Sequence, residues 1–210
     1  MNRIRERVKD HLPAVLLTLL SIVQALALEL LWSLLEELDV LYEPSWLAAT
    51  LWGQIVANFL GIILIWVVYV STVMRFAWLP AIGDSVYPFL IGVGEFILIE
   101  TARPGFLGIW FIQMALVFAI MNLVSHLTLR RARAETENDW FFLKVGPATL
   151  SDFYPAVVVT AGLSGSGICF IVLEVPAIVS LALVLIVNLL MLWQLYSAKR
   201  FWDRTFVDPD

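Results

Sequence analysis

Residues 80–100 read PAIGDSVYPFLIGVGEFILIE, and this stretch decides the fold class of the chain. It is apolar enough to enter a bilayer, yet it carries Asp84 near its start, Glu95 well inside and Glu100 at its end. A carboxylate inside a membrane span costs roughly 2.5–3.5 kcal/mol on insertion scales. Because such a residue usually faces inward, finds a partner or has a function, Glu95 is the first candidate functional residue.

The rest of the chain is equally apolar. Of its 210 residues, 61% are hydrophobic, and the mean hydropathy is +0.89, whereas soluble domains are about 45–50% apolar. A chain this short cannot bury so much apolar surface in an aqueous core, so the surplus is expected to face lipid. We therefore predict an all-α polytopic membrane protein that forms a single integral membrane domain over residues 1–210.

Each bilayer crossing needs about 20 largely apolar residues, and the sequence predicts six of them. The predicted spans are residues 13–35, 47–74, 82–100, 105–128, 153–173 and 176–198, with a cytoplasmic loop at 129–152. Six spans place all but Arg103 of the 13 Lys and Arg residues on one side. Since basic residues favour the cytoplasmic side, we predict that both termini are cytoplasmic, in a membrane of the bacterial inner (plasma) type.

Prolines mark the expected ends of the spans. Three of them, 67 residues apart and each followed by Ala, begin the outward spans: Pro13, Pro80 and Pro147. Three others open the return spans: Pro44, Pro104 and Pro176. This pattern suggests three helical hairpins of one kind, or a closer twofold relation between 80–100 and 147–174. The alternative is that proline is common at helix starts and the spacing is coincidence.

Several polar side chains lie within the predicted spans. Gln24 and Glu29 lie in the first span. Two carboxylates and three amides share a depth of about 8–16 Å below the outer edge, at 1.5 Å per residue: Glu29, Gln54, Asn58, Glu95 and Gln113. This layer is expected to line a cavity open to the outside, where acidic loops would concentrate cations.

The alternative for this layer is structural. Amides hydrogen-bond across membrane helices for about 0.6 kcal/mol on average, with no function required. The two carboxyl groups could be protonated, or reach the interface. Because the spans offer no Lys or Arg, the partner expected for either carboxylate is water, a proton or a bound cation.

Small residues predict close helix contacts in two spans. Gly53, Ala57 and Gly61 recur every four residues in the second span, and Gly162 and Ser166 have the same spacing in the fifth. Such spacing lets another helix approach closely, within the subunit or in a homo-oligomer. For the fifth span, the run of Gly and Ser also allows a broken helix that lines an ion site.

The loop at 129–152 is basic, then acidic, then aromatic. Its basic residues are expected to face anionic lipid, and its aromatic residues to lie at the level of the headgroups. These residues are Arg130, Arg131, Arg133, Trp140 and Phe141. The alternative is a docking site for a cytoplasmic partner protein.

The sequence has one cysteine and lacks G-x-S-x-G, H-E-x-x-H and P-loop motifs. We therefore predict no enzyme, cofactor, metal site or nucleic-acid partner, although an intramembrane enzyme using Asp84, Asp152 or Glu95 is an alternative. The expected function is a small channel or transporter for a cation, proton or small solute, with an outer-half cavity around Glu29 and Glu95. The competing hypothesis is a non-transporting scaffold or sensor subunit that acts through a partner.

Overall fold

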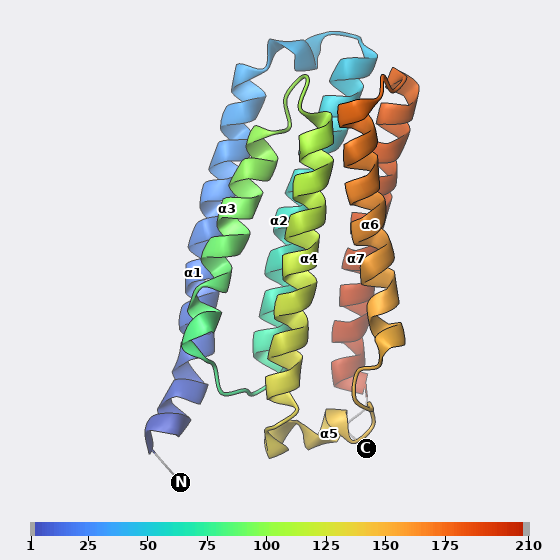
Figure 1. The fold of residues 1–210 in the computed structure, drawn as a ribbon. Helices are drawn as coiled ribbons and strands as arrows, with labels where there is room; N and C mark the ends of the chain where they lie inside the picture. Colours follow the sequence, from blue (N-terminus) through green and yellow to red (C-terminus); the bar gives the residue numbers. More distant parts are fainter. Residues whose placement is uncertain (1–2, 208–210) are drawn as a thin grey trace.

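The computed structural model describes residues 3–207, and every secondary-structure element in this part of the chain is a helix. Its α-helices are α1 (Arg3–Glu37), α2 (Trp46–Arg75), α3 (Tyr87–Glu100), α4 (Leu107–Ala132), α5 (Asp139–Phe142), α6 (Leu150–Val172) and α7 (Ala177–Val207). Three short 3-10 helices are η1 (Asp39–Tyr42), η2 (Ile82–Ser85) and η3 (Thr136–Asn138). Helix α1 begins and α7 ends at the same end of the bundle, here called the basal end; the opposite end is the apical end (Figure 1).

Five helices are long and apolar enough to cross a membrane: α1, α2, α4, α6 and α7. The all-helical class and the apolar spans are therefore as predicted. The third predicted span is shorter, because α3 has only 14 residues and rises about 21 Å at 1.5 Å per residue. That is less than the hydrocarbon core of about 30 Å, so the length of α3 does not by itself establish a sixth crossing.

The five long helices and α3 form two layers (Figure 1). In one layer α2 lies between α1 and α7; in the other α4 lies between α3 and α6, and α1 packs on α3 to join the layers. The first two predicted hairpins, α1–α2 and α3–α4, are packed as hairpins. The third is divided between the layers, because α6 packs mainly on α4 and α7 mainly on α2.

Local sequence signals explain where two of the helices begin. The Ser45 hydroxyl accepts a hydrogen bond from the backbone N–H of Ala48 and caps α2. At the start of α6, the Asp152 carboxylate accepts the backbone N–H of Thr149 at 2.7 Å, which is the reciprocal half of a capping box. Helix α6 then continues without interruption to Val172, so residues 161–170 do not form the broken helix that was one alternative.

Glycines allow close helix contacts at several levels of the bundle, and two of these contacts lie in the apical half. A Cβ added to Gly53 would be 2.6 Å from Cγ1 of Val184 in α7, and one added to Gly108 would be 2.9 Å from the carbonyl oxygen of Gly167. Helices α2 and α7, and helices α4 and α6, can approach this closely only through residues without side chains.

The predicted small-residue contacts divide into two groups. Gly53 lies at the contact with α7, and Ala57 is fully buried. A Cβ at Gly61 or Gly162 would meet nothing within 4 Å, and Ser166 is half-buried. Within one copy of the chain, Gly61 and Gly162 therefore do not make the close helix contacts that the sequence predicts for them. Gly167 is the residue through which α6 contacts α4.

Candidate functional site

A buried carboxyl group lies at the centre of the bundle. Helix α3 carries Glu95 inward, where its side chain is 3% exposed. Gln24 of α1 donates from Nε2 to Oε2 of Glu95 at 2.9 Å. The other carboxylate oxygen, Oε1, and the amide oxygen of Gln24 have no hydrogen-bond partner among the described residues. The pair therefore leaves two acceptors unused.

Buried amides continue this polar region across the bundle. Trp110 of α4 donates from Nε1 to Oδ1 of Asn58 at 3.1 Å, and Asn188 of α7 donates to the carbonyl oxygen of Gly53 at 2.9 Å. Nδ2 of Asn58 and Nε2 of Gln54 are buried without a partner among the described residues. Since a buried polar atom without a hydrogen bond costs about 1–3 kcal/mol, these amide N–H groups are suited to donate hydrogen bonds to a guest molecule or water.

A cavity of about 200 Å³ lies beside these groups, between the two layers. Helices α2, α3, α4 and α7 line it. Its polar lining residues are Asn58, Glu95, Asn122, Ser125 and Gln194. Its apolar lining residues are Ile62, Leu64, Ile65, Val68, Leu98, Ile99, Met114, Val117, Phe118, Met121 and Met191.

The cavity extends from Glu95 toward the basal end. On α4 its lining runs from Met114 to Ser125, while α4 itself spans Leu107–Ala132. The interior on the apical side is filled, since Trp110 and Phe111 are at most 1% exposed and their rings meet edge to face at 5.1 Å. The predicted cavity that opens to the outside is therefore absent on the apical side, because the rings of Trp110 and Phe111 fill the interior there.

Two smaller spaces lie basal to this cavity, each of about 20 Å³. The first shares Ser125 and Met121 with the main cavity and reaches Tyr69 and Thr128. The second also contains Tyr69 and Thr128 and reaches Asp84. The three spaces are separate but share lining residues, so they lie one after another between Glu95 and Asp84.

Two of the five predicted cavity residues, Glu95 and Asn58, line the cavity. Gln54 is buried on the apical side of Asn58, and Gln113 is half-buried and donates to the carbonyl oxygen of Gly94 at 3.4 Å. The structure does not bring Glu29 into this group.

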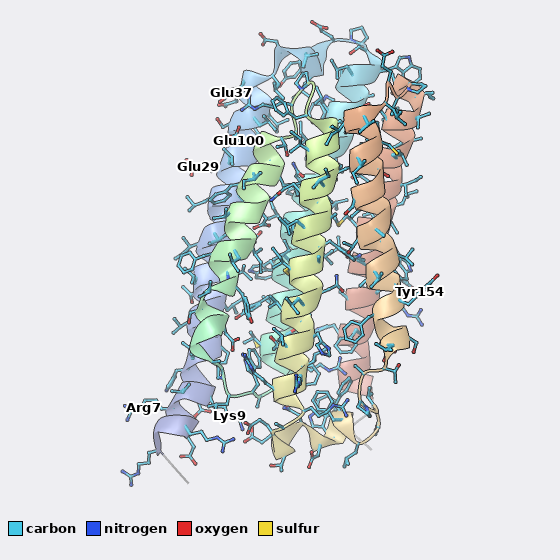
Figure 2. All side chains as sticks on the ribbon, in the orientation of Figure 1. Arg7, Lys9, Glu29, Glu37, Glu100 and Tyr154 are labelled. Carbon is cyan, nitrogen blue, oxygen red and sulfur yellow. The ribbon has the colours of Figure 1, made fainter. Side chains whose placement is uncertain are left out.

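Glu29 is exposed and lies on the outer side of α1 (Figure 2). Its grouping with Glu95 is corrected, and the α1 residue at the site is Gln24. At 100° per residue, these two positions of α1 lie about 140° apart and cannot face the same neighbour. The structure shows which face of α1 is turned inward, since Leu20, Ala27 and Leu31 are buried on the side of Gln24; the sequence carries no signal for it, because the opposite face is apolar as well.

The basal end is closed by contacts that we call the basal lock, formed by Arg75, Asp84, Arg131, Glu135 and Asn138. The Arg75 guanidinium lies 3.8 Å from the ring centroid of Phe201 and 4.9 Å from that of Phe141. Because cation–π attraction strengthens when a cation loses water, this cluster fastens α2 to α7 and to the loop.

Asn138 is the most buried member of the basal lock, at 1% exposed. Its Nδ2 donates to the carbonyl oxygens of Ala77 and Ala132, both at 2.6 Å, and its Oδ1 accepts from the backbone N–H of Ala77 at 3.0 Å. Nearby, Arg131 at the end of α4 forms an ion pair with Asp84 of η2. These contacts fix the basal ends of α2, α3 and α4 relative to one another.

Glu135 joins α1 to the lock. It forms ion pairs with Lys9 and Arg5, each at 3.0 Å. Burial by itself raises the pKa of the Glu135 carboxyl, but the hydrogen bonds and positive charges of Lys9 and Arg5 outweigh this, so the pKa lies below its usual value. Folding therefore favours the ionised carboxylate of Glu135.

The loop at 129–152 is folded against the basal end. Of its predicted interaction residues, Arg131 pairs with Asp84, Arg133 donates to the carbonyl oxygens of Val145 and Gly146, and Phe141 is half-buried. Arg130 is exposed, and Trp140 stacks on Phe76 with one side while 45% of its surface stays exposed to lipid or a partner.

Two residues of the catalytic alternative have structural contacts. Asp84 is 6% exposed and ion-paired, and Asp152 caps α6. Within residues 3–207, no group of three or more His, Cys, Asp or Glu side chains is placed to hold a metal ion. Comparison with protein-family models, with curated proteins and with solved structures finds no match to this chain.

Proposed function

We propose that this protein is a small membrane transporter or channel for a cation or proton, with Glu95 as the binding group. One observation carries the proposal: a buried carboxyl group with an unpartnered oxygen lines a cavity inside an apolar bundle. None of the described residues that line this cavity is basic. Since a buried carboxylate without a partner is costly, its partner is a mobile proton or cation.

The solute reaches Glu95 from the basal end. In support, the cavity extends in that direction, and two smaller, separate spaces lie beyond it, beside Tyr69 and Asp84. The aromatic packing around Trp110 closes the apical side. This conformation is closed at both ends, with its free space on the basal side of Glu95, and transport requires the basal lock and the apical contacts to open in turn.

In the membrane the chain crosses six times, with the basal end in the cytoplasm. Helix α3 crosses together with η2, whose four residues add about 8 Å at 2.0 Å per residue, so the two elements together rise about 29 Å. Cysteines placed at Asp39 and at Glu137 are expected to react with impermeant reagents from opposite sides. Reaction of both from one side would show that the number of crossings between them is even, which would exclude three crossings by α2, α3 and α4.

The functional test compares two carboxyl groups of the same membrane region. Glu95→Gln keeps the shape and removes the charge; Glu29→Gln makes the same change on the outer side of α1. In reconstituted vesicles we expect at least about a tenfold loss of proton or cation flux for Glu95→Gln, equivalent to about 1.4 kcal/mol, and near-normal flux for Glu29→Gln. Equal flux in both variants and the unchanged protein would exclude Glu95 as the binding group.

The second candidate function is a scaffold or sensor subunit, with both termini and the loop in the cytoplasm. It is favoured by the exposure of Arg130 and Trp140 on the basal surface, beside a loop that is otherwise held in place. In that case Arg130→Ala and Trp140→Ala would abolish the cellular effect of the protein, while Glu95→Gln would not.

A further inference from the structure

We propose that the cavity binds an organic monocation whose cationic head lies at Glu95 and whose apolar body, about one aromatic ring in size, lies among the aliphatic and methionine side chains. This names the substrate class of the proposed transporter and rests on that proposal. It follows from the chemistry of the walls, the size of the cavity and the position of the carboxyl group.

The walls do not suit a hydrated inorganic ion. Hard cations need several oxygen ligands at close range, but the lining near Glu95 consists of residues such as Leu98, Ile99 and Met114. An ion that entered would lose its water and gain few ligands. An alkylated ammonium has no ligand shell to replace, and its apolar groups gain from contact with the same walls.

The polar groups at the apical end of the cavity provide one place for positive charge. Oε1 of Glu95 has no partner, whereas Oε2 is held by Gln24. The hydrogen bond from Gln24 orients the carboxylate, and Oε1 remains free to contact the cationic head of the guest. Farther toward the basal end, the lining is largely apolar, with Asn122, Ser125 and Gln194 at its border.

The volume sets the size of the guest. A cavity of about 150 Å³ in an apolar protein core is known to accept benzene, and the present cavity of about 200 Å³ is somewhat larger. It has room for one ring with a small ammonium head. Three of the residues that line it are methionines, Met114, Met121 and Met191. Their flexible side chains can adjust to guests of different shape.

The test uses the purified full chain in lipid nanodiscs and measures binding by calorimetry. The probes are benzyltrimethylammonium; tetramethylammonium, which has the charge without the ring; and neopentylbenzene, the neutral isostere of the first, used as a competitor. We expect benzyltrimethylammonium to bind at least about tenfold more tightly than tetramethylammonium. Neopentylbenzene is expected to compete only weakly.

Two pairs of variants locate the site. Glu95→Gln is expected to weaken benzyltrimethylammonium at least about tenfold, while Glu29→Gln binds as the unchanged protein does. Gly61→Leu places a side chain in open space at the cavity wall, where a Cβ would meet nothing within 4 Å, so it fills the cavity and blocks the probe. Gly162→Leu makes the same change on the exposed surface of α6 and leaves binding intact.

The outcomes separate this inference from the function on which it rests. If proton or inorganic-cation flux depends on Glu95 but benzyltrimethylammonium does not bind, the substrate class is wrong and the transporter proposal stands. If neither flux nor binding depends on Glu95, both are wrong. Should Glu95→Gln fail to fold, unchanged binding in Gly61→Leu, or equal affinity for tetramethylammonium, is sufficient to overturn the inference.

Discussion

The apical and basal halves of this bundle are built differently. In the apical half, glycines bring helices into direct contact and Trp110 and Phe111 fill the interior. In the basal half, the two layers stand apart around a cavity of about 200 Å³. Between the layers, Trp110 of α4 contacts Asn58 of α2 on the apical side, and Asn138 of the basal lock joins the ends of α2 and α4 on the basal side.

This division has an energetic reason. Lipid is as apolar as the side chains, so membrane helices associate through close packing and hydrogen bonds rather than through hydrophobic burial. An empty cavity gives up dispersion contacts along its walls. The basal half must therefore be held by the ion pairs, cation–π contacts and hydrogen bonds of the lock, which leave the space above them open.

The largest effect is expected from overfilling the apical contact. In Gly108→Leu the new Cβ would lie 2.7 Å from Cγ1 of Ile171 and 2.9 Å from the carbonyl oxygen of Gly167. Because backbone cannot move aside as a flexible side chain does, the loss of stability should be about 3 kcal/mol or more, at the upper end for overpacked sites. Thermal unfolding in detergent would measure it.

The matched control is Gly61→Leu, where the new side chain enters the cavity. This variant should unfold close to the temperature of the unchanged protein. A large loss of stability in Gly61→Leu, equal to that of Gly108→Leu, would mean that the basal half is as tightly packed as the apical half.

Removing the central side chain of the basal lock should have the next largest effect. Asn138→Ala loses three hydrogen bonds and leaves the backbone groups of Ala77 and Ala132 without partners. At 0.5–1.5 kcal/mol for each bond, the expected loss is roughly 2–4 kcal/mol. It should be seen as a lower unfolding temperature and as faster proteolysis of the loop at 139–150.

Asp139→Ala, at the neighbouring exposed position, is the control for Asn138→Ala. If both variants unfold and are cleaved alike, the bonds of Asn138 do not hold the loop in place. In that case the hydrogen bonds of Asn138 would not explain how the basal half is held together.

The smallest effect concerns pH and the ion pairs of Glu135. Because the folded pKa of this carboxyl is lowered, its favourable contribution is present above its ordinary value of 4.5 and is lost as the pH falls through the folded pKa. Glu135→Gln should therefore be less stable than the unchanged protein at pH 7, by about 0.2–1 kcal/mol. The difference should vanish in strong acid.

Unfolding temperatures of both proteins across this pH range would check the prediction for Glu135. Glu6→Gln, exposed on the first turn of α1, serves as the control. A stability difference that grows as the pH falls would have the wrong sign and would show that the carboxylate is not the stabilising form.

The sequence by itself determined the class of the protein and the course of its long helices. An apolar run of about 20 residues is long enough to cross a bilayer as a helix. The positions of α1, α2, α4, α6 and α7 can therefore be predicted from hydropathy and length. Glu95 could likewise be singled out, because a carboxyl group so far inside an apolar stretch requires an explanation wherever its helix packs.

Only the tertiary structure decided which polar residues meet. In a membrane helix every face is apolar, so the sequence does not show which face is turned inward, and Glu29 and Glu95 look equivalent. Rotation of α1 about its axis places Gln24 against Glu95 and leaves Glu29 outside. The basal direction of the cavity was also decided by packing, because Trp110 and Phe111 fill the apical interior whereas no side chain fills the space beside Gly61.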